Sequence, residues 1–152
     1  MKVKFKQLHE NAVIPFKTHE RDFCYDCVAT SCEEIASNVY KYGLGFALEI
    51  VDNRKHEGSI LSIDARPRSS IYKTGMVLSN SQGTIDEPYR GEICAVFYHV
   101  LPNMPKYEVG DKICQIKLGV TGKMDFEVVD ELSSTERNDG GYGSTGAWET
   151  NV

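Results

Sequence analysis

The sequence of 152 residues has no apolar run that approaches the ~20 residues of a membrane-spanning helix. Its first residues, MKVKFKQLHENAV, carry charges throughout, whereas a signal peptide needs an apolar block there. An overall basic surface is also missing, because 17 lysines and arginines stand against 22 acidic residues and the net charge is −5. These absences predict a cytoplasmic protein with no membrane partner and no nucleic-acid partner. They do not exclude a nucleotide as ligand.

The cysteines are few and odd in number, which fits reduced thiols better than a disulfide framework. Three of the five lie close together, at Cys24, Cys27 and Cys32, a spacing that could suggest zinc. No second pair and no suitably spaced histidine completes a set of four ligands. We therefore interpret the cysteines as small packing residues.

Helical periodicity is nearly absent, and short runs rich in β-branched and aromatic residues dominate the chain. The length and the apolar fraction of 41% indicate one globular domain. An all-β fold, a sandwich, jelly roll or barrel, is therefore predicted, with one short helix. Strands are predicted at residues 45–51, 59–65, 75–78, 92–101, 112–120 and 125–129.

Three details of this fold also follow from the sequence. The strand at residues 92–101 is apolar in both alternating sets, which favours burial on two faces and a central position. A helical turn is expected at residues 69–73, with serine as its cap. Glycines crowd the end of the chain, which predicts a β domain of residues 1–136 followed by a flexible tail of residues 137–152.

Two internal segments carry residue types suited to nucleotide chemistry. Residues 66–70 place Arg68 and two serines after a proline-fixed bend, a good arrangement for an anion. In residues 83–92, glycines bracket Asp86 and Tyr89, a carboxylate that can serve as general base and a ring that can form the wall of a sugar pocket. Taken singly, each segment is better explained without a ligand, the first as a helix cap beside a solvated arginine and the second as a polar turn with a packing tyrosine.

The glycine-rich segment at residues 137–146 is the third candidate. Glycines let the backbone approach a ligand closely, and Arg137, Ser144 and Thr145 add donors for phosphate oxygens. The ring of Tyr142 could lie flat on a planar base. No lysine precedes the serine as in a Walker A loop, and no βαβ unit surrounds the glycines as in a dinucleotide fold. A disordered tail remains the alternative.

In order and in spacing, these segments resemble the five motifs of the trimeric dUTPase family, over residues from about 21 to 146. Tyr25-Asp26 is similar to the core of motif one, with Phe23-Cys24 in place of the usual Ala-Gly. The other matches are Arg68-Ser69-Ser70 for motif two, GTIDEPYRG from Gly83 for motif three, YEVGDKICQIKL from Tyr107 for motif four and RNDGGYGSTG from Arg137 for motif five. The resemblance implies a jelly-roll or barrel homotrimer whose active sites are shared between subunits.

The resemblance also implies hydrolysis of dUTP to dUMP and pyrophosphate, by attack of water on the α-phosphorus. Asp86 would be the catalytic base that activates the water. Tyr89 would pack on the deoxyribose and leave no room for a 2′-hydroxyl. A hairpin from Asn80 to Asp86 would read uracil with its backbone groups.

The remaining implied roles concern the phosphates and the metal ion. Asp26 would hold Mg²⁺ through water, because magnesium usually keeps several of its waters. The tail would come from a neighbouring subunit and close over the nucleotide, with Tyr142 on the base and Arg137 on the γ-phosphate. The implied substrate-binding residues are Arg68, Ser69, Ser70, Asn80, Gly83, Thr84, Ile85, Tyr89, Gln115, Arg137, Tyr142, Gly143, Ser144 and Thr145.

Three other functions stay open at this point. A dCTP deaminase-like enzyme of the same fold would need a glutamate on the strand after motif three, where Val96 stands. A non-catalytic regulatory module would be favoured if Asp86, Tyr89 or the tail were missing, and all three are present. An all-β interaction protein with a glycine linker would make four ordered motif matches an accident.

Overall fold

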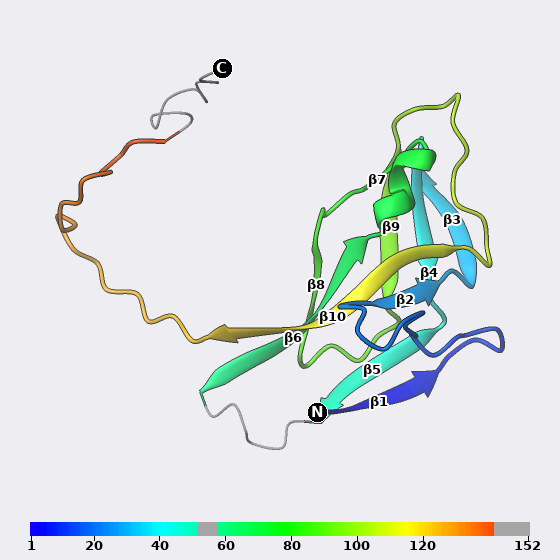
Figure 1. Cartoon of the computed structure of the whole chain (residues 1–152), viewed down its shortest axis with the longest axis horizontal. Coiled ribbons are helices and arrows are strands. Elements are labelled where there is room, and N and C mark those ends of the chain that lie inside the picture. The colour runs from blue at the N-terminus through cyan, green and yellow to red at the C-terminus, as the bar shows by residue number, and fades with distance from the viewer. Residues whose placement is uncertain (52–57, 142–152) are drawn as a thin grey trace.

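The structure is a computed structural model that describes residues 1–51 and 58–141. Its regular elements in this part of the chain are strands and one short 3-10 helix (Figure 1), which confirms the all-β prediction. The elements are β1 (Lys2–Gln7), β2 (Tyr25–Val28), β3 (Ser31–Ala36), β4 (Val39–Gly43), β5 (Phe46–Val51), β6 (Ser59–Pro67), η1 (Ser69–Lys73), β7 (Met76–Leu78), β8 (Gly83–Asp86), β9 (Cys94–His99) and β10 (Lys112–Gly122).

The strands form three antiparallel sheets. One four-stranded sheet, in the order β2-β10-β6-β8, carries the expected site residues and is called the site sheet below. A second four-stranded sheet has the order β3-β4-β9-β7, and β1 pairs with β5 in a separate two-stranded sheet. In the site sheet, β10 pairs with β6 from Cys114 opposite Pro67 to Gly122 opposite Ser59.

The core is apolar, and three of its aromatic rings pack on one another. Tyr42, Phe97 and Tyr107 pack edge to face, with ring centroids 5.8, 6.5 and 5.4 Å apart. The hydroxyl of Tyr42 is buried and donates to the carbonyl oxygen of Tyr107 at 2.7 Å. The Tyr42 side chain therefore contributes a large buried surface without leaving its polar atom unpaired.

Five of the six predicted strands are present, as β5, β6, β7, β9 and β10. The β9 strand lies inside its sheet, between β4 and β7, as expected. The prediction that this strand is buried on two faces was wrong, because Ala95 and Phe97 are buried whereas Tyr98 is half exposed. The apolar residues of its second face thus lie on an outer sheet surface of the single chain.

The predicted strand at residues 125–129 is not formed. Among the described residues after Gly122 there is no strand, and Figure 1 shows this segment leaving the body of the molecule. Residues 123–136 are called the arm below. Met124, Phe126 and Val128 alternate with polar residues as in a strand, but a strand also needs a hydrogen-bonding partner, and the body of this chain supplies none.

Two local expectations are also corrected. The helix η1 lies where it was predicted, but its N-cap is Arg68, and no side chain makes a capping hydrogen bond. The segment from Asn80 to Asp86 is not a hairpin, because β7 pairs with β9 and β8 pairs with β6. This segment instead passes from one sheet to the other.

One face of the site sheet holds a largely buried ion pair. The Lys117 ammonium donates to Asp64 Oδ2 at 2.8 Å, and the Ser62 hydroxyl donates to Asp64 Oδ1 at 2.9 Å. Burial alone would raise the pKa of Asp64, but the hydrogen bonds from Lys117 and Ser62 outweigh it and lower that pKa. The ion pair therefore stabilises the pairing of β6 with β10 on this face.

Replacing Lys117 by methionine should destabilise the fold by about 3 kcal/mol, because it leaves a buried carboxylate without its cation. Urea unfolding at neutral pH measures this loss. Since the folded pKa of Asp64 is lowered, its contribution is complete above the unfolded pKa of about 3.9 and is lost as pH falls through the folded value. The free energies of unfolding of the Lys117→Met variant and the unchanged protein, plotted against pH, should therefore converge in acid.

The matched control is Lys123→Met, which removes an exposed ion pair with Asp125. This change should leave the free energy of unfolding nearly unchanged, because water screens such pairs. Equal losses in the two variants would contradict the role given to the buried pair.

Candidate functional site

Eight of the expected site residues line the walls of two separate pockets in the described chain. The first, of about 360 Å³, is called the carboxylate pocket, and its walls include Thr84, Ile85, Asp86 and Tyr89. The second, of about 390 Å³, is called the cationic pocket, and its walls include Asp26, Arg68, Ser69 and Gln115. No residue lines both pockets.

In the carboxylate pocket, Asp86 is exposed at the end of β8, and Tyr89 follows in a tight turn. The backbone N–H of Tyr89 donates to the carbonyl oxygen of Asp86 at 3.0 Å. The Tyr89 hydroxyl donates to the carbonyl oxygen of Glu92 at 3.0 Å, which fixes the ring over Gly91. A Cβ atom at Gly91 would collide with the hydroxyl end of the Tyr89 ring, so a larger residue there would displace the ring.

The backbone of β8 is available on one side. The strand pairs with β6, with Asp86 opposite Ser62, and stands at the edge of the site sheet. Within the described chain, no strand pairs with its outer edge, so N–H and C=O groups there can bond a planar ligand. Asn80 lies against this strand, with its amide nitrogen 3.0 Å from where a Cβ of Gly83 would be.

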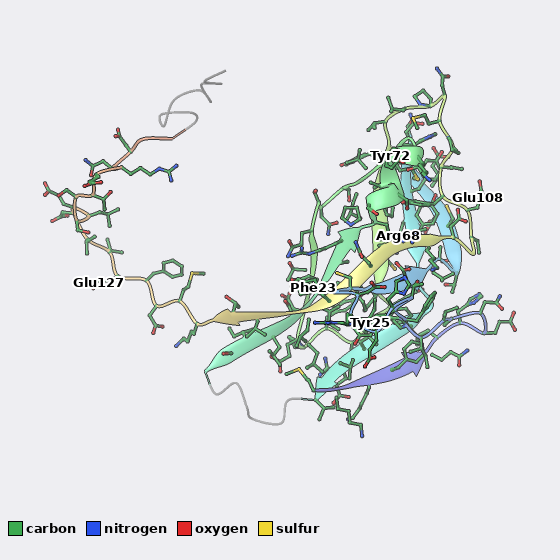
Figure 2. The ribbon with its side chains drawn as sticks, in the orientation of Figure 1. Phe23, Tyr25, Arg68, Tyr72, Glu108 and Glu127 are labelled. Atoms are coloured by element: carbon green, nitrogen blue, oxygen red, sulfur yellow. The ribbon has the colours of Figure 1, made fainter. Side chains whose placement is uncertain are left out.

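The cationic pocket is organised by Asp26, whose side chain is 15% exposed. Asp26 Oδ1 accepts from Arg68 Nε at 3.0 Å, and Oδ2 accepts from the Lys112 ammonium at 3.1 Å. Arg68 Nη1 also donates to the Ser70 hydroxyl at 3.3 Å. Two cations around one carboxylate leave a local positive charge, which suits an anionic ligand. Figure 2 shows Arg68 and Phe23 on the body of the molecule beside β10.

The sequence did not single out two basic residues of this region. Lys112 begins β10, and the one available signal was its place in the strand that also carries Gln115. Arg66 pairs with Gln115 across the sheet, and its buried Nε atom has no hydrogen-bond partner in the described chain. The Gln115 amide donates to the carbonyl oxygen of Pro67 at 2.9 Å, which holds it in the pocket wall.

The register of the site sheet separates the two pockets. Asp26 pairs with Gln115 and Gln115 with Arg66, whereas Asp86 pairs with Ser62. With strands 4.8 Å apart and 3.3 Å per residue, Asp26 and Asp86 are about 14 Å apart across the sheet and about 13 Å apart along it. Asp86 therefore cannot reach a phosphate group that Arg68 of the same chain holds.

The tail residues expected at the site are only partly described. Arg137 lines neither pocket, and its Nε donates to the carbonyl oxygen of Gly140 at 2.9 Å. Tyr142, Gly143, Ser144 and Thr145 lie outside the described residues.

Within residues 1–51 and 58–141, no group of three or more His, Cys, Asp or Glu side chains could hold a metal ion. Asp26 is the acidic residue expected near the phosphates, and each of its oxygens already accepts from a cation. None of the helices in these ranges has the length and apolar character that crossing a bilayer requires.

The sequence matches one family model, and two of its curated relatives have the same name. The dUTPase family model matches residues 10–146. Relatives named deoxyuridine 5'-triphosphate nucleotidohydrolase, from Crocosphaera subtropica and Clostridium novyi, are 34% and 35% identical. Each alignment covers 96% of this chain and 99% of the relative.

The fold is similar to that of solved phage dUTPases. The dUTPase of Staphylococcus bacteriophage 80alpha with dUpNHpp superposes with a TM-score of 0.74 at 20% identity, over 96% of this chain and 99% of the phage chain. A mutant dUTPase of phage phi11 of S. aureus, with a structural Mg(II) ion, gives 0.66 at 19% identity, over 88% and 100% of the two chains. By its family match and its relatives, the chain belongs to the dUTPase family.

Proposed function

We propose that the protein hydrolyses dUTP to dUMP and pyrophosphate. The observation that carries the proposal is the placement of Asp86 and Tyr89 in one pocket, beside the open edge of β8, in a member of the dUTPase family. The pocket supplies a carboxylate, a ring and free backbone groups, which are the three kinds of group that reaction needs at its nucleoside end.

Asp86 acts as general base in this proposal. Its carboxylate takes a proton from a water molecule, whose oxygen then forms a bond to the α-phosphorus while the bond to pyrophosphate breaks. A positioned general base typically contributes about 10²–10⁴ in rate. The exposure of Asp86 at the end of β8 leaves its carboxylate free to contact both water and the sugar.

The nucleoside is recognised by Tyr89 and by the backbone of β8. Because the hydroxyl of Tyr89 is tied to Glu92, the ring is a fixed wall that a ribose 2′-hydroxyl would strike. Backbone groups between Asn80 and Asp86, including Gly83, Thr84 and Ile85, bond the uracil edge. Cytosine is rejected because its amino group presents a donor where uracil accepts.

The triphosphate is held by the cationic pocket. Arg68 is the main anion-binding group, and its ion pair with Asp26 orients the guanidinium before the ligand arrives. Ser69, Ser70 and Gln115 add neutral donors around it. These groups offset the charge that grows on the leaving pyrophosphate.

Magnesium fits this site as an ion that arrives with the substrate. A single carboxylate, Asp26, whose oxygens already accept from Arg68 and Lys112, does not hold a metal ion by itself. It can still accept from water in the hydration shell of an ion bound to phosphate oxygens, the usual mode for Mg²⁺. When bound, the ion supplies neutralisation of phosphate charge.

A homotrimer with shared sites would bring the carboxylate pocket of one copy next to the cationic pocket of another. Since Asp86 and Arg68 of one chain cannot contact the same triphosphate, the carboxylate pocket of one copy must face the cationic pocket of another. A closed ring of three copies repeats this heterologous contact three times. The tail, with Arg137, Tyr142, Gly143, Ser144 and Thr145, then comes from a neighbouring subunit to close over the nucleotide.

The arm supports such an assembly. Phe126 and Val128 are 86% and 101% exposed, and Figure 2 shows Glu127 between them far from the body. A groove of about 480 Å³ on the body is open and mainly apolar, with Phe5, Leu48 and Ile116 in its walls. Burying the arm of one copy on another would remove both apolar surfaces from water.

The activity is tested with dUTP, dCTP, dTTP and UTP in the presence of magnesium, by following pyrophosphate release. Release should occur from dUTP alone. Asp86→Asn should lower kcat by about 10²–10⁴ and still bind dUpNHpp, because the amide keeps the shape of the carboxylate but cannot take the proton.

The control for this variant is Glu33→Gln, which changes an exposed carboxylate on β3 that lines neither pocket. It should keep full activity. Release of ammonia from dCTP would assign the protein to the deaminase class instead, because deamination leaves the triphosphate intact. Binding of dUTP without turnover would make it a regulatory module.

The role of the arm is tested by a double change of Phe126 and Val128 to aspartate. Charges at these positions should prevent burial of the arm, so trimers should dissociate into monomers, as measured by sedimentation velocity. Glu127→Gln, between the two positions, should stay trimeric. A double variant that remains a trimer would show that other surfaces hold the copies together.

A further inference from the structure

Two thiols face each other in the core beside the cationic pocket. Cys27 on β2 and Cys114 on β10 are direct partners in the antiparallel register, and both side chains are fully buried. Neither is linked to another cysteine. The hydrogen bond with Cys114, then burial, then the neighbouring Asp26 charge raise the pKa of the Cys27 thiol well above its usual range.

We propose that Cys27 and Cys114 are an oxidation site that forms an intramolecular disulfide with a peroxide. Opposed residues of an antiparallel pair have Cα atoms about 4.5–5.5 Å apart, which lies within the range of disulfides. The other paired cysteines face different residues, since Cys32 lies opposite Tyr42 and Cys94 lies opposite Gly43. Register thus selects one pair among the cysteines that lie in strands.

The reaction balances with the peroxide as the only oxidant. One sulfur attacks a peroxide oxygen, the oxygen–oxygen bond breaks, and a sulfenic acid and one water result. The second thiol then attacks the sulfenic sulfur, the sulfur–sulfur bond forms, and a second water leaves. Two thiols are oxidised and one hydrogen peroxide is reduced to two waters.

The pair reacts through local opening of β2. Burial and a raised pKa make both thiols slow to react while the sheet is closed. However, β2 has only four residues and pairs with β10 with a register shift between Lys112 and Cys114. On its outer side it is held by an isolated bridge between Asp26 and Phe16, and no strand of the described chain pairs there. Strand ends of this kind open far more often than the whole domain unfolds.

The disulfide would act on the cationic pocket without belonging to it. Side chains alternate along a strand, so Asp26 and Gln115 point to the face opposite their neighbours Cys27 and Cys114. A covalent link between β2 and β10 would therefore fix the strands that carry two pocket residues. It would also restrain the unfolded chain between the two positions.

The test uses the full-length protein and hydrogen peroxide, and does not depend on nucleotide hydrolysis. The intact mass should fall by about 2 Da, and protease mapping without reductant should link the peptides that contain Cys27 and Cys114. Tm should rise by about 5 °C or more. Amide exchange in β2 should become slower, and a reductant should reverse all four changes.

Cys27→Ala and Cys114→Ala should each abolish the mass loss, whereas Cys32→Ala, at an exposed position, should retain it. The peptide map of the unchanged protein decides the question even where an alanine variant folds poorly. Added oxygen atoms in place of the 2 Da loss, a bond to Cys24 or Cys32, or a link formed only after denaturation would overturn the proposal.

Discussion

The register of β10 between β2 and β6 is the constraint on which the rest of the structure depends. It sets Gln115 in line with Asp26 and Arg66, and it places Lys117 against Asp64. A shift by one residue would move these polar side chains into the core and expose Ile116 and Cys114. The two antiparallel pairings of β10 therefore build the core and the cationic pocket together, on opposite faces of the same strands.

The same register divides the candidate site within one chain. Asp26 belongs to one edge strand of the site sheet, Asp86 belongs to the other, and two strands lie between them. In the proposed function, Asp86 of one pocket acts on a phosphate that Arg68 of the other pocket holds, so a complete site would take its groups from two copies. An assembly that unites the two pockets would also bury the exposed apolar arm.

Part of the fold was predictable because some strands have a local sequence pattern that marks them as strands. Apolar residues alternate along β6, at Leu61, Ile63 and Ala65, and along β10, at Cys114, Ile116 and Leu118, and turn formers mark the strand ends. By contrast, β3 is exposed along its whole length and has no apolar periodicity to detect. The strand expected at residues 125–129 has the right alternation, and what it lacks is a partner, which no local pattern can supply.

The candidate residues themselves were predictable from their types and order, since Asp86 with Tyr89 and Arg68 with its serines are local motifs. The structure places each of these groups in a pocket wall or next to one. Their separation and the role of Lys112 were not predictable, because both arise from pairing between strands far apart in sequence. The hairpin expected at Asn80 failed for the same reason, as its two sides join different sheets.

Subunit complementation tests the shared site most directly. Asp86→Asn and Arg68→Ala chains, each inactive alone, are mixed, unfolded and refolded together, and dUTP hydrolysis is measured. If each site takes Asp86 from one copy and Arg68 from another, random assembly should restore about one quarter of the wild-type activity. A mixture no more active than its two components would show that each chain carries a whole site and would contradict this account.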